Sequence, residues 1–241
     1  MRFDTYTEQV ACWPTEGRHI LAQSDATHVV VYQAYRPSIA DHAVAHQRFG
    51  GDFSFSRMSW IKPNFLWMMF RSGWAGKEGQ ERILALTLKR TFFEGLLLAA
   101  VPSGFQGSGF DNKEAWEQAV QDSDVRLQWD PDHDPFGAPV ARRAIQLGLR
   151  GETLAEFATD ALLGVDDITA FVHQQRANVN GGCERLLIPS ERVYVPGQAA
   201  ARRIGLDPAP ADRNLQRCPF GIDISAPAAS SISAPAASSR G

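Results

Sequence analysis

The sequence predicts an α+β fold, with a single domain in which a mixed, mostly antiparallel sheet is packed by helices. Strand-like and helix-like segments follow one another without a regular strand–helix–strand repeat, which argues against a doubly wound parallel sheet. Neither GxGxxG nor GxxxxGKS/T follows a predicted strand, so Rossmann-type and P-loop nucleotide binding are not indicated. The 241 residues are 44% hydrophobic and 21% charged, a composition that can build a substantial core.

Residue patterns place the individual elements. β-branched and aromatic content or alternation predicts strands in four stretches: 26–37, 81–90, 125–132 and 183–196, the last holding one or two strands. Apolar periodicity predicts helices at 37–49, 63–72, 91–101, 113–121, 140–151, 153–163 and 166–177. Pro37 and Pro63 suit the first turns of two of these helices, and Gly50 and Gly73 follow their ends.

The C-terminal part differs in composition from the rest. The seven-residue sequence SAPAASS occurs twice, starting at Ser225 and Ser233. Ser, Ala and Pro bury too little apolar surface to offset the conformational entropy that is lost when a segment becomes ordered. We therefore predict one globular domain over 1–196, a poorly ordered extension rich in Pro, Ala and Arg over 197–220, and a disordered tail over 221–241.

Charge and targeting signals limit the function classes. The net charge of −3 excludes a protein that coats nucleic acid by bulk attraction. The three cysteines form no CxxC pair, the N-terminal segment lacks the apolar core of a signal peptide, and no apolar run reaches the ~20 residues that span a bilayer. A cytoplasmic location without a membrane partner is expected; the oligomeric state is not predicted.

The stretch RMSWIKPNFLWMMFRSGWA, residues 57–75, combines aromatic side chains with fixed cations. A helix with apolar residues nearly all round is expected to be buried, and a buried Arg71 would then need an acid, carbonyl groups or a ligand anion as partner. Arg57 and Lys62 precede this helix, where anions are favoured. We interpret the stretch as core and pocket wall together, with these candidate ligand-binding residues: Arg57, Ser59, Trp60, Lys62, Asn64, Trp67, Arg71 and Trp74. A core helix whose cations pair with acids elsewhere is the alternative.

Two further positions extend this candidate site. Tyr35 and Arg36 stand at a strand-to-helix junction, where strand ends often present ligand-binding groups. Glu191 lies on a predicted final strand and becomes a catalytic candidate only in combination with Arg36.

The acidic stretch WDPDHDPFG, residues 129–137, contains side chains of the kind that bind a divalent cation: Asp130, Asp132, His133 and Asp134. Alternating aspartates resemble calcium-binding spacing, but the EF-hand positions for Gly and Glu hold Pro135 and Ala141. We expect a turn whose aspartates pair with the following arginines, among them Arg142, and predict no metal site.

Several runs, among them VYQAYRPSIADHAVAHQRFGG, FSFSRMSWIKPNFLWMMFRSGWA and ERVYVP, resemble the domain-of-unknown-function family numbered 4291. The resemblance covers roughly residues 6–196 and implies no particular activity.

The order of elements is also similar to that of ADP-ribosyltransferases. That likeness implies NAD as cofactor, with Arg36 holding NAD, Ser59 or the region of Phe70 lining the nicotinamide pocket, and Glu191 orienting the ribose or the acceptor. The chain lacks a Ser-Thr-Ser triplet and a Glu-x-Glu pair. The expected function is a nucleotide- or phosphate-ligand-binding enzyme, an NAD-dependent transferase that is ADP-ribosyltransferase-like, with RNA or DNA as a possible acceptor.

A rival hypothesis comes from a different class. Cations interleaved with aromatic side chains also suit single-stranded nucleic acid, whose phosphates contact Arg and Lys while its bases stack on Trp. The alternative is therefore a single-stranded nucleic-acid-binding protein without catalysis.

Overall fold

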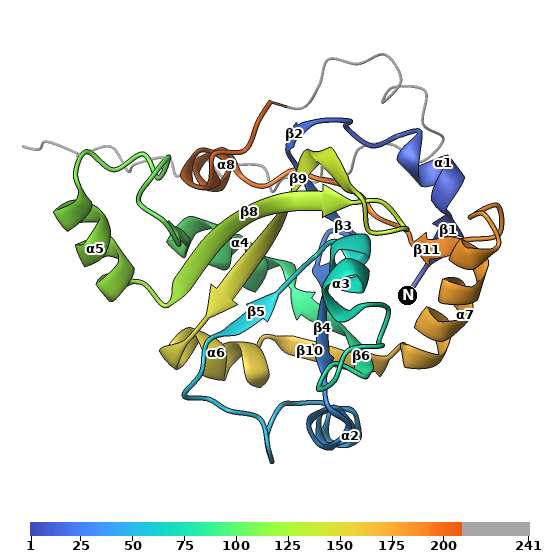
Figure 1. Ribbon diagram of the computed structural model, residues 1–241. Coiled ribbons are helices and arrows are strands. Elements are labelled where there is room, and N and C mark those ends of the chain that lie inside the picture. The colour runs from blue at the N-terminus through green and yellow to red at the C-terminus, as the bar shows by residue number, and fades with distance from the viewer. Residues whose placement is uncertain (209–241) are drawn as a thin grey trace, which may run out of the picture.

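The computed structural model describes residues 1–208 and confirms the α+β class (Figure 1). The strands are β1 (Phe3–Thr5), β2 (Gly17–Arg18), β3 (Ile20–Ala22), β4 (His28–Tyr35), β5 (Ser59–Ile61), β6 (Arg82–Lys89), β7 (Val101–Pro102), β8 (Val125–His133), β9 (Pro139–Leu149), β10 (Leu162–Asp167), β11 (Leu187–Pro189) and β12 (Arg192–Tyr194). The helices are α1 (Tyr6–Val10), α2 (Pro37–His46), α3 (Phe65–Ser72), α4 (Arg90–Ala99), α5 (Lys113–Asp122), α6 (Gly151–Ala158), α7 (Thr169–Asn180) and α8 (Gln198–Ile204).

A three-stranded antiparallel sheet in the order β10-β6-β4 separates two hydrophobic cores. Alternate residues of β4 serve the two sides: Val29 and Val31 belong to a core shared with α2, α4 and α6, whereas Val30 and Tyr32 belong to a core shared with α3 and α7. Because both faces are covered, the strand reads as a continuous apolar run, and each buried aliphatic side chain contributes about 1.5–3 kcal/mol.

The second large sheet is built around the long antiparallel pair β8 and β9, with β2, β7 and β5 at its sides. The helix predicted over 140–151 was wrong, because this segment forms most of β9. Its Ala, Arg, Gln and Leu residues favour helix, but β9 pairs with β8 along its length and with β5 on its other edge, and this pairing overrides local propensity.

The short segment 59–62 connects the two sheets. β5 pairs with β9 through Ser59–Leu149 and Ile61–Leu147, and the next residue, Lys62, accepts a hydrogen bond of 2.7 Å from the backbone N–H of Tyr32 in β4. Pro63 then fixes the chain before α3. The backbone on both sides of Lys62 is therefore held by the fold, and its side chain leaves from a fixed point.

Helix α3 begins at Phe65, two residues after Pro63, where the predicted helix began. Asn64 is its N-cap, accepting a 2.7 Å hydrogen bond from the N–H of Trp67, and Gly73 ends the helix in the left-handed conformation at φ 59°. Six of its residues are buried, but Phe70 and Arg71 are exposed. Arg71 is therefore not buried in the core, because the helix has no apolar cover on this side.

The C-terminal elements close the fold. β12 pairs with β3, and β11 pairs with β1. The predicted poorly ordered extension starts with a helix instead: α8 packs on α4 and buries Ala200 and Ile204. The remainder of that extension and the repeat tail lie outside the described residues. Within 1–208, no helix has the length and hydropathy needed to cross a membrane.

Candidate functional site

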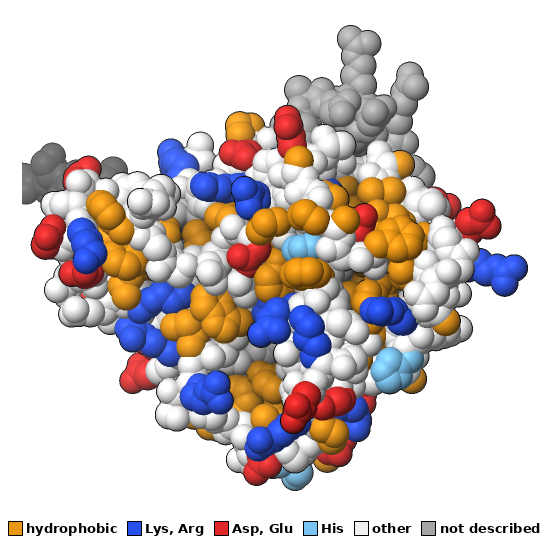
Figure 2. All heavy atoms as spheres, in the orientation of Figure 1, with side chains coloured by type: hydrophobic (Ala, Val, Ile, Leu, Met, Phe, Trp, Pro, Cys, Tyr) orange, Lys and Arg blue, Asp and Glu red, His pale blue; other side chains and the backbone are white. Residues whose placement is uncertain are grey.

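A cleft of ≈ 790 Å³ opens where β4, β5 and α3 meet the β8–β9 pair. It brings together eight of the predicted site residues. Four are cations: Arg36, Arg57, Lys62 and Arg71; the others are Tyr35, Ser59, Trp60 and Trp67. Figure 2, in the orientation of Figure 1, shows Lys and Arg side chains around hydrophobic ones over the region of β5 and α3.

The three arginines of the cleft differ in their partners. Arg36 is exposed and forms an ion pair of 3.0 Å with Asp52, which also lines the cleft. Arg57 and Arg71 are exposed, and their guanidinium groups make no ion pair or hydrogen bond with any residue of the described part. Two guanidinium groups therefore face the cleft with their donors available.

Lys62 is the buried cation of the cleft, with 5% of its surface exposed. Its Nζ lies 4.8 Å from the centroid of the Trp67 ring, and it forms no ion pair with a carboxylate among residues 1–208. Burial, and to a smaller extent the positive charge of Arg71, lowers its pKa to about 7, while Asp130 opposes the shift. A large share of the Lys62 amine is therefore neutral at neutral pH.

A hydrogen-bonded wall lies on the β4–β5 side. The Gln33 amide donates to Oγ of Ser59 at 2.8 Å and to the carbonyl of Trp60 at 3.0 Å, and the Tyr35 hydroxyl lies 2.9 Å from the same Ser59 Oγ. Burial raises the pKa of Tyr35 above its usual range, so its hydroxyl keeps its proton. The Gln33 Oε1 atom is buried and has no hydrogen-bond partner among the described residues.

The amides of Gln128 and Gln146 line the β8–β9 side of the cleft. Gln146 donates to Oε1 of Gln128 at 3.0 Å and to Oδ2 of Asp130 at 2.6 Å. Burial raises the pKa of Asp130, although the Gln146 hydrogen bond and the charge of Lys62 partly counteract this.

Sequence reasoning missed Gln33 and Gln128 and misplaced Gln146 on a helix. Had 140–151 been interpreted as a strand, antiparallel pairing would have placed Gln146 opposite Gln128, as the observed register does. The sequence of the β8–β9 hairpin therefore contained the information needed to place Gln146 beside Gln128. No residue pattern identifies Gln33, whose role depends on the approach of β5 to β4.

Three predicted site residues do not line the cleft. Asn64 is the buried N-cap of α3, and Trp74 packs in the core against Phe65 at a ring-centroid distance of 6.0 Å. Glu191 is fully buried, and its Oε1 accepts a 2.6 Å hydrogen bond from the first N–H of α3, on Phe65.

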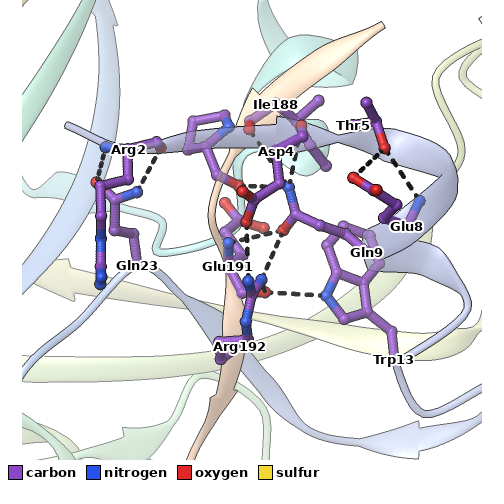
Figure 3. Close-up of polar contacts among 11 residues, drawn as sticks. Arg2, Asp4, Thr5, Glu8, Gln9, Trp13, Gln23, Ile188, Glu191 and Arg192 are labelled. Atoms are coloured by element: carbon purple, nitrogen blue, oxygen red, sulfur yellow. Dashed lines mark hydrogen bonds and ion pairs between the residues drawn. The ribbon is translucent and has the colours of Figure 1, made fainter. Parts of the chain in front are cut away.

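The backbone around Glu191 is tied to the N-terminal segment (Figure 3). Its N–H donates to Oε1 of Gln9 at 2.8 Å, and its carbonyl accepts from the Trp13 indole at 3.1 Å. Burial raises the pKa of Glu191 well above its ordinary value. The expected catalytic pair of Arg36 and Glu191 is therefore not assembled: Arg36 lines the cleft, and Glu191 caps a helix inside the core.

The acidic stretch forms separate contacts. Asp132 accepts hydrogen bonds of 2.8 and 2.6 Å from Nε and Nη2 of Arg142, which confirms the expected ion pairing. Asp134 caps its own turn by accepting from the N–H groups of Phe136 and Ala138. In the described part of the chain, no three His, Cys, Asp or Glu side chains converge as a metal site would require.

Comparison with known proteins identifies a family. No curated protein matches the chain. The family model described as domain of unknown function (DUF4291) matches residues 19–194, more than two thirds of the sequence, and this region contains every residue of the cleft. The chain therefore belongs to the DUF4291 family.

Proposed function

We propose that the cleft binds a nucleotide or another phosphate-bearing ligand and that the protein is an enzyme acting on it. The observation that carries this proposal is the pair Arg57 and Arg71, whose guanidinium groups line one cleft without an acidic partner in the described residues. Guanidinium forks match the geometry of phosphate oxygens. Arg36 can also bind the phosphate if it releases its ion pair with Asp52.

The size and the remaining lining fit this ligand class. A volume of ≈ 790 Å³ falls in the range of about 300–1,000 Å³ that small-molecule sites occupy. The half-buried ring of Trp60 offers an apolar wall for a base or sugar. The Oε1 atom of Gln33, which has no hydrogen-bond partner within residues 1–208, offers an acceptor to a ligand donor.

NAD is one member of this ligand class, and ADP-ribosyl transfer from NAD is a narrower form of the proposal. That reaction is helped by a carboxylate beside the oxocarbenium-like carbon. Asp52 lines the cleft and is in reach of such a ligand, whereas Glu191 is not, so the narrower proposal uses Arg36 with Asp52.

A thermal-shift titration with ATP, NAD and inorganic phosphate tests the proposal. Ligand at 100 times its Kd adds about 2.7 kcal/mol to the free energy of unfolding. We expect a shift with at least one nucleotide, and we expect Arg57→Gln and Arg71→Gln each to weaken it. Arg185→Gln is the matched control, because Arg185 is exposed, outside the cleft, and loses the same charge.

The nucleic-acid alternative gives a different result in the same assay. Trp67 is 6% exposed and lies against Lys62, which leaves little of its ring for stacking on a base. Tight, steeply salt-dependent binding of single-stranded RNA without a response to mononucleotides or NAD would overturn the proposed function and favour that alternative.

A further inference from the structure

We propose that the ε-amine of Lys62 is the nucleophile of this cleft and forms an imine with a carbonyl carbon of a phosphate-bearing ligand. This inference rests on the proposed function, because the arginines of the cleft must hold the phosphate. The ligand class is thereby narrowed to phosphorylated aldehydes and ketones, including sugar phosphates in their open-chain form.

The position of Lys62 is costly for a residue with only a structural role. An ammonium group removed from water loses several kcal/mol of hydration unless carboxylates compensate it. Lys62 has the Trp67 ring at 4.8 Å and no ion pair in the described part of the chain. A Leu or Met side chain would fill the same space without this cost, so an amine at this position indicates chemistry.

The surroundings match those that activate lysine. A lysine becomes a nucleophile when it is desolvated or lies next to another cation, because both disfavour the ammonium form. Lys62 has both features: it is buried, and the positive charge of Arg71 acts on it from α3. The carboxyl group of Asp130 on β8 acts in the opposite direction and is held by Gln146.

The geometry also supplies the direction of attack. The backbone of Lys62 is fixed by β5, by the hydrogen bond from Tyr32 and by Pro63, and its side chain reaches the cleft that Arg57 and Arg71 line. A phosphate on the guanidinium groups would therefore anchor a ligand whose carbonyl carbon can meet the amine.

The step balances without an oxidant or reductant. The nitrogen lone pair of the neutral amine attacks the carbonyl carbon, giving a carbinolamine. The C–O bond then breaks, the C=N bond forms, and the oxygen leaves as water with the two hydrogens of the original amine. Asp130 is the candidate donor of a proton to the departing hydroxyl, because its charge and that of Lys62 act on each other and burial raises its pKa.

Lysine labelling is easy to interpret in this chain, because it has few lysines to distinguish: Lys62, Lys77, Lys89 and Lys113. The last three are exposed. An ordinary lysine is neutral in about one molecule in 2,500 at pH 7, whereas a group titrating near pH 7 is about half neutral. Two probes are used: formaldehyde with cyanoborohydride, which reports the amine alone, and pyridoxal 5′-phosphate with borohydride, which reports amine and phosphate site together.

We expect formaldehyde to modify Lys62 at pH 7 at least about tenfold faster than the other lysines, since the excess of neutral amine outweighs limited access. Among the four lysines, pyridoxal phosphate should add to Lys62, and inorganic phosphate should slow this addition. Lys62→Met and Lys62→Arg should abolish this addition, and Lys89→Arg should not. Thermal unfolding of each variant shows whether it is folded.

Two different results would overturn the nucleophile assignment and the proposed function separately. If pyridoxal phosphate stabilises the protein and competes with phosphate but leaves Lys62 unmodified, the nucleophile assignment is overturned and the proposed function stands. If formaldehyde prefers Lys62 but neither phosphate nor pyridoxal phosphate interacts with the cleft, the proposed function is overturned together with the ligand class.

Discussion

Two buried cations of this protein lie against indole rings, and their surroundings differ. Arg142 packs on Trp13 at 5.1 Å, forms a two-point ion pair with Asp132, and donates to the carbonyl of Pro14 at 2.6 Å. Lys62 packs on Trp67 at 4.8 Å and forms no ion pair within the described residues. Hydrogen bonds and an ion pair thus compensate the buried charge of Arg142. The charge of Lys62 has no such compensation, which lowers the pKa of its amine.

The difference indicates a structural role for Arg142 and a functional role for Lys62. The pair of Arg142 and Asp132 joins the β8–β9 hairpin to the N-terminal segment and is closed to solvent. Lys62 reaches a cleft where two more cations lack acidic partners in the part that the structure describes. A buried cation with a complete set of acceptors stabilises a conformation, whereas one without them is available to a ligand.

The largest expected effect comes from breaking the compensated pair. Arg142→Met leaves Asp132 buried without its partner, which should lower the free energy of unfolding by about 3–5 kcal/mol. Urea unfolding followed by circular dichroism measures the loss. The double variant Asp132→Asn, Arg142→Met should recover a large part of it; an equal or greater loss in the double variant would contradict the assignment of the cost to an unpaired carboxylate.

Removing the uncompensated cation should have the opposite sign. Lys62→Met should raise the free energy of unfolding by about 1–4 kcal/mol at pH 6, because it removes a buried charge without a partner. In the folded protein the pKa of Lys62 is lowered to about 7, below its unfolded value, so the unfolded chain binds more protons between these two pKa values.

The stability of the wild type therefore rises relative to Lys62→Met as the pH increases from 7 towards 10, and the penalty is complete below pH 7. Unfolding curves of both proteins at pH 6, 8 and 9.5 measure this change. A stability difference that does not vary with pH would show that Lys62 keeps its proton in the folded state.

A third prediction concerns a buried acid, Glu191, whose carboxyl group accepts a hydrogen bond at the start of α3. Glu191→Ala should lower the free energy of unfolding by about 1–3 kcal/mol, because the N–H of Phe65 at the start of α3 loses its acceptor in a buried place. Glu191→Gln keeps an acceptor and should restore most of this loss. Both variants should bind the cleft ligand as the wild type does; a loss of ligand binding in a folded Glu191→Gln protein would return Glu191 to the site.

The smallest effect is expected at Arg71, through its charge. Arg71→Gln removes a positive charge that acts on Lys62, and the pKa of Lys62 should rise by a fraction of a unit. The pH profile of formaldehyde labelling at Lys62 measures the shift, with Arg185→Gln as the control that leaves the profile unchanged. A shift to lower pH would contradict the electrostatic relation between the two residues.

Local patterns predicted much of the fold and part of the site. Pro37, Pro63 and the apolar periodicity located α2 and α3, and the run 57–75 located the cleft wall. The strand β9 and the helix α8 depend on tertiary pairing and packing that no local pattern records. Glu191 and Asn64 could not be assigned to the interior for the same reason, since their roles follow from where α3 begins in space.

The measurement that tests the central claim most directly is an NMR titration of the lysine ε-CH₂ groups, with assignments from Lys62→Arg and Lys89→Arg. We predict that Lys62 titrates with a pKa of about 7, well below the ordinary lysine value of about 10.4. A Lys62 signal that titrates at the ordinary lysine value would contradict this prediction, because Lys62 would then be fully charged at neutral pH and could not act as the nucleophile.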